Sequence, residues 1–86
     1  MAYRIEFAPR VYRQFVDLPR KAQARLGLRI EALAGNPRPQ GVKKISGEEN
    51  LYRICWGDYR VVYQVREKDR IVLIAKIGHR REIYRR

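Results

Sequence analysis

The feature that most constrains the fold is a pair of strand-like runs in the second half of the chain. Residues Leu51–Trp56 and Tyr59–Arg66 are rich in aromatic and β-branched side chains, and only Gly57-Asp58 separates them. A two-residue connection of this composition is typical of a tight β-hairpin turn, because glycine accepts the positive φ that such turns require. The sequence therefore predicts an antiparallel pair whose register is set by the turn.

Three other segments are expected to join this hairpin in a sheet. Tyr3, Ile5 and Phe7 alternate with charged residues, as in a strand with one solvent-exposed face. Residues 70–77 are almost continuously Ile, Val and Leu, which favours a central strand covered on both faces. Residues 42–45 are expected to form a short, weak strand.

Between the first strand and the hairpin, apolar residues recur at helical spacing. A short helix is predicted from Pro9 to Pro19, and a second one from there to Gly35. The apolar positions are Val11, Phe15 and Leu18 in the first helix and Ala22, Leu26, Ile30 and Leu33 in the second. We therefore expect one α+β domain over residues 1–86, in the order β-α-α-β-β-β, with a helical hairpin packed on a small, mainly antiparallel sheet.

The net charge indicates the class of partner. Twenty Lys and Arg against nine Asp and Glu give +11, and such self-repulsion favours a polyanionic partner, most commonly nucleic acid. An acidic protein partner is compatible with the same charge. No basic amphipathic helix, lipidation motif, signal peptide or apolar run of the ~20 residues that span a bilayer is recognisable. The expected location is cytoplasmic, without a membrane partner.

The cysteine and histidine counts limit the chemistry. Cys55 and His79 are the single members of their types, so an internal disulfide and a Cys/His zinc site cannot be assembled. We expect chemistry without a metal or cofactor.

Strand alternation predicts which side chains share a face of the sheet. Arg53 should lie with Leu51 and Cys55, and Arg60 with Val62 and Gln64, while Tyr59, Val61, Tyr63 and Val65 form the core side. If the turn sets the register, Arg53 and Arg60 lie within a few residues of each other on adjacent strands. The last strand then leads into residues 79–86, a dense cluster of cationic and aromatic groups.

At these segments the whole chain resembles the RelE/ParE toxin superfamily. The matching motifs are residues 7–9, 18–19, 36–38 and 52–54, and above all Gly57-Asp58-Tyr59-Arg60-Val61-Val62-Tyr63 and Gly78-His79-Arg80-Arg81-Glu82-Ile83-Tyr84. The resemblance implies a RelE-like fold and a toxin of a type II toxin–antitoxin system. It further implies that the toxin cleaves messenger RNA in the ribosomal A site and is held inactive by a cognate antitoxin, which we expect to be acidic.

The same resemblance assigns roles to individual residues. Arg60 and Arg80 match the family's catalytic arginines, Tyr84 its catalytic tyrosine, and Arg53 a basic residue of its active site. At position 55 some members carry a second lysine, whereas this chain has Cys55. Lys43, Lys44 or His79 are candidates to supply the missing charge.

The implied chemistry needs no metal. RNA is cleaved when its 2′-hydroxyl is deprotonated and aligned with the adjacent phosphate, and arginine forks suit the charge that develops on that phosphate. Surrounding cations would lower the pKa of Tyr84, which we take as the base. Arg80 is assigned as phosphate stabiliser or acid and His79 as an auxiliary. The remaining basic residues expected to bind RNA are Lys43, Lys44, Arg81, Arg85 and Arg86.

Other interpretations of the same residues stay open. Arg53 and Arg60 are also compatible with an ordinary solvent-exposed strand face, and Tyr84 with a hydrophobic anchor for the C-terminal segment. Two alternative functions are a ParE-like inhibitor of DNA gyrase and a plain RNA-binding module without catalysis.

Overall fold

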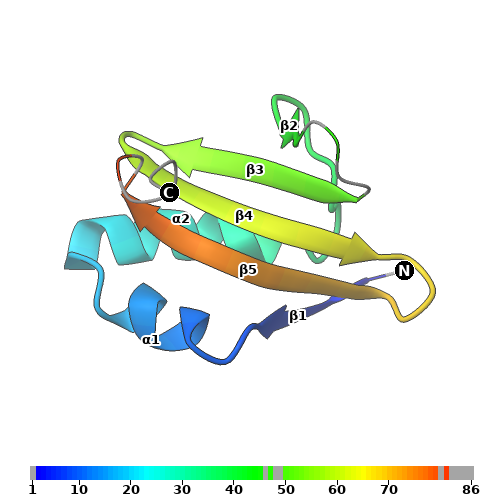
Figure 1. The fold of residues 1–86 in the computed structure, drawn as a ribbon, viewed down its shortest axis with the longest axis horizontal. Coiled ribbons are helices and arrows are strands. Elements are labelled where there is room, and N and C mark those ends of the chain that lie inside the picture. Colours follow the sequence, from blue (N-terminus) through cyan, green and yellow to red (C-terminus); the bar gives the residue numbers. More distant parts are fainter. Residues whose placement is uncertain (1, 46, 48–49, 80, 82–86) are drawn as a thin grey trace.

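The computed structural model describes residues 2–45, 47, 50–79 and 81, and within them it places two helices on one five-stranded sheet (Figure 1). The elements are β1 (Arg4–Phe7), α1 (Val11–Val16), α2 (Arg20–Ala32), β2 (Lys43–Lys44), β3 (Leu51–Trp56), β4 (Tyr59–Arg66) and β5 (Ile71–His79). The strand order is β1-β5-β4-β3-β2; β1 pairs with β5 in parallel, and the other pairs are antiparallel. The predicted α+β fold is confirmed, including the short strand β2.

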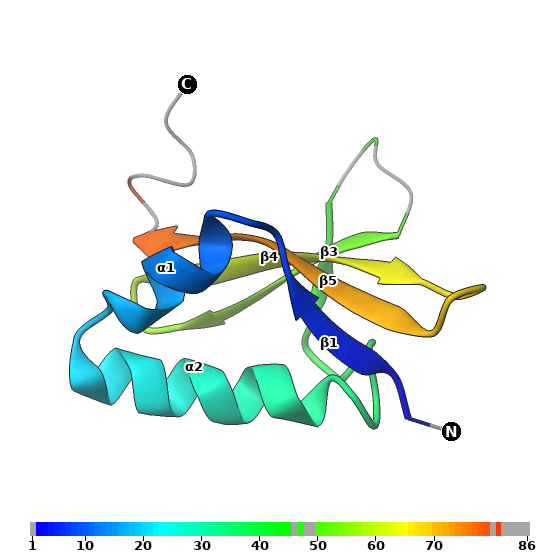
Figure 2. The ribbon, with the colours of Figure 1, turned by 90° about the horizontal axis from the view of Figure 1, so that it is seen from below.

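One face of the sheet carries the hydrophobic core. Val11 of α1 and the α2 residues Leu26 and Ile30 join one buried cluster with every second residue of β4, because alternate strand side chains point to the same face. The cluster contains Val11, Leu26, Ile30, Leu33, Ile54, Val61, Tyr63, Val65, Val72, Ile74 and Ile77. Both helices thus lie on this helix-covered face, and Figure 2 shows α2 running along it. None of the described helices is long and apolar enough to cross a bilayer.

The β3–β4 hairpin closes on the predicted two-residue turn. Trp56 pairs with Tyr59 on either side of Gly57 and Asp58, and Cys55 pairs with Arg60. Gly57 has φ 58°, a left-handed conformation that glycine adopts without a Cβ penalty. The two-residue turn therefore fixes which side chains of the hairpin lie together.

Strand β5 departs from simple alternation. Tyr63 pairs with Ile74, but the preceding Val62 pairs with Lys76, so Ala75 is an extra residue and forms a β-bulge. The strand is central, as predicted, because it lies between β1 and β4. The expectation that both its faces are covered is wrong at Lys76, which is exposed, because the helices cover only one face of the sheet.

A polar network ties the segment after α2 to the sheet. The buried Tyr63 hydroxyl donates to the Pro37 carbonyl oxygen at 2.6 Å, and the Arg38 Nε donates to the Tyr52 hydroxyl at 2.8 Å. Arg38 also forms a 2.6 Å salt bridge with Glu67, whose carboxylate accepts a second bond of 2.6 Å from the Tyr3 hydroxyl. Burial raises the pKa of Tyr63, whereas the hydrogen bonds from Tyr3 and Arg38 lower the pKa of Glu67.

Candidate nucleic-acid interface

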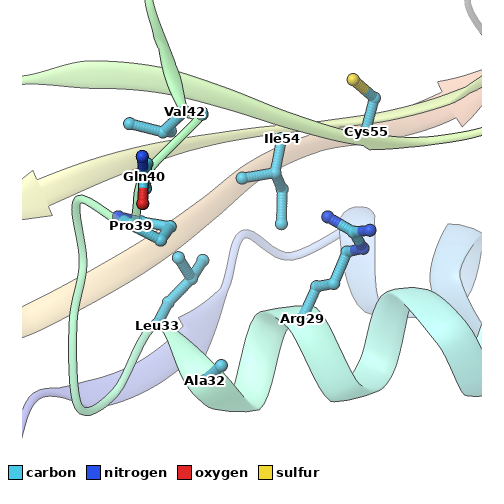
Figure 3. Close-up of a pocket in the computed structure, with 9 residues that line it drawn as sticks. Arg29, Ala32, Leu33, Pro39, Gln40, Val42, Ile54 and Cys55 are labelled. Atoms are coloured by element: carbon cyan, nitrogen blue, oxygen red, sulfur yellow. The ribbon is translucent and has the colours of Figure 1, made fainter.

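Neither α1 nor α2 packs on the second face of the sheet, here called the open face. The close-up in Figure 3 shows the alternation on β3 directly: Ile54 points toward α2, whereas the sulfur of the next residue, Cys55, points away from it. Arg53 shares the open face with Cys55 by strand periodicity. Because directly paired residues of antiparallel strands lie on the same face, the pairing of Cys55 with Arg60 places Arg60 there too.

Arg53 and Arg60 are diagonal neighbours on this face. Arg53 pairs with Val62 and Arg60 with Cys55, so the two arginines are offset by two positions on adjacent strands. Cα atoms in this diagonal relation are about 7–8 Å apart. Both side chains are half-buried, and their Nε atoms are shielded from solvent. The register therefore brings together the two sheet arginines that the sequence predicted as site residues.

The guanidinium of Arg60 is fixed by the hairpin turn. Its Nη1 donates to the carbonyl oxygens of Gly57 and Tyr59, at 2.8 and 3.0 Å. Its buried Nε has no hydrogen-bond partner within the described part of the chain, and such a group has a free energy cost unless a ligand provides an acceptor. A phosphate oxygen is a chemically suitable acceptor because it would form a charge-assisted bond.

The three candidates to compensate for Cys55 occupy different faces. Lys43 pairs with Arg53 and so lies on the open face, whereas Lys44 pairs with Tyr52 on the helix-covered face. His79 pairs with Tyr59, also on the helix-covered face, and the two rings are 5.7 Å apart in an edge-on arrangement. Of the three, Lys43 is the residue that the fold places beside Arg53.

His79 lies at the end of β5 and interacts with its neighbours there. Its Nε2 is 3.8 Å from the Asp58 carboxylate, and its Nδ1 accepts a hydrogen bond of 3.3 Å from the backbone N–H of Arg81. Arg81 is exposed. The other predicted site residues, Arg80, Tyr84, Arg85 and Arg86, lie outside the described residues, so their approach to Arg60 stays a prediction.

The sequence reading did not identify Lys76 as a site residue. Lys76 is exposed and pairs with Val62, so it lies on the open face on the opposite side of β4 from Arg53. No simple alternation could have placed it there, since the bulge at Ala75 shifts the register between Val62 and Tyr63.

The open face is electropositive over the hairpin and β5. The strands β2 to β5 contain no Asp or Glu, while Lys43, Arg53, Arg60 and Lys76 all lie on this face. The acidic residue on β1, Glu6, is in a 2.9 Å salt bridge with Arg4. This arrangement suits a polyanion that lies over β2–β5.

A separate pocket of about 330 Å³ opens between α2 and the edge of the sheet (Figure 3). It is lined by Arg29, Ala32, Leu33, Pro39, Gln40, Gly41, Val42, Ile54 and Cys55. Ile54 points into it and belongs to the helix-covered face. Its lining includes Cys55 but neither Arg53 nor Arg60, so the pocket is distinct from the arginines of the open face. No group of three or more His, Cys, Asp or Glu side chains that could hold a metal occurs within the described ranges.

Known proteins match both the sequence and this fold. The family model described as "ParE toxin of type II toxin-antitoxin system, parDE" matches residues 5–84. A curated protein of Methanocaldococcus jannaschii, "Putative toxin RelE1", is 34% identical over 88 residues, which cover 99% of this chain and 98% of that protein. Both matches extend over nearly the whole chain.

Two solved structures illustrate the similarity of fold. A chain of the archaeal RelE–RelB complex from Pyrococcus horikoshii OT3 is 33% identical, with a TM-score of 0.80 over 93% of this chain and 97% of that one. The isolated E. coli RelE toxin is 25% identical, with a TM-score of 0.84 over 91% of this chain and 84% of that one.

Two helices on a five-stranded mixed sheet, with a sequence match over nearly its full length, define a toxin of the type II toxin–antitoxin class. More narrowly, the chain belongs to the RelE/ParE toxin superfamily, and the relative and structures named above are RelE proteins.

Proposed function

We propose that this toxin is a ribosome-dependent endoribonuclease that cleaves messenger RNA in the ribosomal A site. The observation that supports it most is the diagonal pair of arginines, Arg53 and Arg60, on an open face whose strands β2–β5 carry no acidic residue. Two arginines whose Cα positions are about 7–8 Å apart can direct their planar guanidinium forks to the oxygens of one phosphate group, or of two neighbouring ones. A plain solvent-exposed strand face would not need Arg60 anchored on two backbone carbonyls.

The proposed reaction is an internal transesterification of RNA. The 2′-oxygen forms a bond to the adjacent phosphorus while the bond to the 5′-oxygen breaks, leaving a 2′,3′-cyclic phosphate and a 5′-hydroxyl. One group must accept the proton of the 2′-hydroxyl and another must donate a proton to the leaving oxygen. Arg53 and Arg60 stabilise the negative charge that develops on the phosphorane, and their fixed positions reduce reorganisation during the step.

The C-terminal residues have the proton-transfer roles in this proposal. Tyr84 is the base, with its phenolate favoured by the surrounding cations, and Arg80 stabilises the phosphate or acts as the acid. His79 is an auxiliary residue: its Nδ1 accepts the Arg81 N–H, and so it helps to position the start of that segment. Lys43, Arg81, Arg85 and Arg86 bind flanking phosphates, and Lys44 adds to the general attraction for ribosomal RNA.

The ribosome and an antitoxin are the proposed partners. An 86-residue domain offers little surface to align a single strand, so the ribosome is proposed to hold the messenger in the reactive geometry, in the cytoplasm. The +11 charge favours an acidic antitoxin, and a similar chain from P. horikoshii is found in a RelE–RelB complex. An acidic segment over the open face would exclude RNA by occupying the same cations.

Inhibition of DNA gyrase is the second candidate, because the family model that matches is described by its ParE members. A gyrase inhibitor acts on a protein and has no need for two arginines beside each other on an open sheet face. The two proposals therefore differ in whether Arg60 is essential for toxicity.

Primer extension on a defined messenger in a purified translation system tests the nuclease proposal. The wild-type chain is expected to give cuts at fixed codon positions when ribosomes are present, and Arg60→Ala and Tyr84→Phe are each expected to reduce cutting by about 100-fold or more, the usual cost of losing one group that stabilises the transition state. Arg66→Ala is the matched control: alternation along β4 puts Arg66 on the open face as well, but it is exposed at the opposite end of the strand from Arg60. Loss of gyrase supercoiling without messenger cuts would instead support the second candidate.

A further inference from the structure

We infer that Lys76 is a further RNA phosphate-binding residue of the open face, and that the RNA strand crosses the β-strands there instead of running along them. The inference rests on the proposed function, because it assumes that the open face receives RNA. It is carried by the pairing of Val62 with both Arg53 and Lys76, which places a cation on each side of one buried apolar residue.

The register defines a row of side chains across four strands. Lys43 pairs with Arg53, Arg53 with Val62, and Val62 with Lys76, so the row runs from β2 through β3 and β4 to β5. Neighbouring strands lie about 4.8 Å apart, so the backbones of Arg53 and Lys76 are about 10 Å apart across β4. Arg and Lys side chains are long enough for both to reach a phosphate group, or two successive ones, above Val62.

The bulge in β5 is what gives Lys76 this position. If Val62 paired with Ala75 in unbroken register, Lys76 would face Val61 in the core and Ile77 would lie on the open face. Instead, Ile77 is 5% exposed and belongs to the core cluster, while Lys76 is solvent-exposed. Bulges are frequent beside functional sites because they redirect a side chain in this way.

The chemistry around Lys76 favours a phosphate over other ligands. Val62, 8% exposed, offers no polar atom, and β3, β4 and β5 contain no acidic residue. Glu6 lies on β1, the other neighbour of β5, and is in a salt bridge with Arg4. Lys76 makes no salt bridge with another described residue. A lysine in such surroundings is a compact charge available to an anion, and in this fold it adjoins the arginines proposed to hold the scissile phosphate.

Binding of a cleavage-resistant RNA tests Lys76 separately from catalysis. A 2′-O-methyl RNA oligonucleotide about ten nucleotides long, within the usual site size, lacks the 2′-nucleophile and so reports binding alone. Its affinity for the full chain is measured from low to moderate salt. With Lys76→Gln, the slope of log K against log salt is expected to become shallower by about 0.7, the value for one phosphate contact to a single strand.

Lys68→Gln is the matched control for this experiment, because it removes the same charge from the exposed turn beyond β4. It is expected to leave the slope unchanged, and Lys76→Arg is expected to restore it. Equal slopes for Lys76→Gln and Lys68→Gln would overturn the inference, even if the wild type cleaves messenger RNA. If Lys76→Gln alone flattens the slope but no variant cleaves RNA, the binding role stands and the nuclease proposal fails.

Discussion

At the scale of single residues, two sets of polar contacts in the described residues have different functions. Arg60 is anchored on the carbonyl oxygens of the turn, at the face where we propose that RNA binds. Tyr63, Arg38 and Glu67 form the second set, which ties the segment around Pro37 to the helix-covered side. Substitutions in the first set should therefore alter activity, and those in the second should alter stability.

Tyr63→Phe is expected to destabilise the fold. The Tyr63 side chain is fully buried, and its hydroxyl donates a hydrogen bond of 2.6 Å to the Pro37 carbonyl oxygen. Removing the hydroxyl leaves this buried acceptor without its hydrogen bond. The expected loss in free energy of unfolding is about 1–2 kcal/mol, measured by denaturant titration. Tyr12→Phe is the control: Tyr12 is 58% exposed, so this substitution should change the free energy of unfolding little. Equal stability of both variants and the wild type would mean that the Pro37 contact contributes nothing.

Glu67 should make stability depend on pH in the acid range. Hydrogen bonds from Tyr3 and Arg38 lower the pKa of Glu67 in the folded chain relative to its ordinary 4.5. The stability that this group contributes is fully present above that ordinary value and is lost as pH falls through the lower, folded pKa. The difference in Tm between wild type and Glu67→Gln should thus be larger at pH 7 than at pH 3. If the difference in Tm between the two proteins does not change with pH, the hydrogen bonds to Glu67 do not contribute to stability as proposed.

At the scale of elements, the hairpin and the bulge show what sequence can and cannot predict. The β3–β4 hairpin follows from local chemistry, since Gly57 and Asp58 set a register that places Cys55 opposite Arg60. That local rule was enough to predict the meeting of Arg53 and Arg60. Helix positions also followed from the apolar spacing, because both helices bury one stripe against the sheet.

The β5 bulge could not be predicted from this sequence. An extra residue in one strand is decided by how both strands pack against the core, and here Ile74 and Ile77 both reach the core although they are three residues apart. Strict alternation would place Ile74 and Ile77 on opposite faces of the sheet. For the same reason the sequence reading missed Lys76, and it did not separate His79 from the open face, because faces beyond the bulge depend on the shifted register.

Gly57→Ala tests the turn that positions Arg60. Gly57 has φ 58°, and a Cβ there would meet no neighbouring atom, so the cost comes from backbone conformation alone. We expect the free energy of unfolding to fall by about 1 kcal/mol, measured by chemical denaturation. Gly35→Ala is the matched control: a Cβ at Gly35 would come no closer than 3.9 Å to the Ala32 carbonyl oxygen. If Gly35→Ala proves as costly as Gly57→Ala, the conformational argument is wrong.

At the scale of the whole molecule, the two faces of one sheet have different roles. The helix-covered face holds the core, and the open face carries Lys43, Arg53, Arg60 and Lys76 without an acidic strand residue on β2–β5. The net charge of +11 attracts any polyanion, but the register concentrates four cations where one RNA strand can contact them. Mutation can therefore separate the general attraction of the net charge for RNA from the contacts that the open-face cations make with it.

The central claim is that Arg53 and Arg60 act on the same phosphate, and a double-mutant cycle tests it most directly. Single-turnover cleavage of a messenger on purified ribosomes is measured for wild type, Arg53→Ala, Arg60→Ala and the double variant. Residues that act as a unit are non-additive, so the double variant should cleave little more slowly than the slower single variant. Cleavage by Arg60→Ala at the wild-type rate, or fully additive losses in the double variant, would contradict the account.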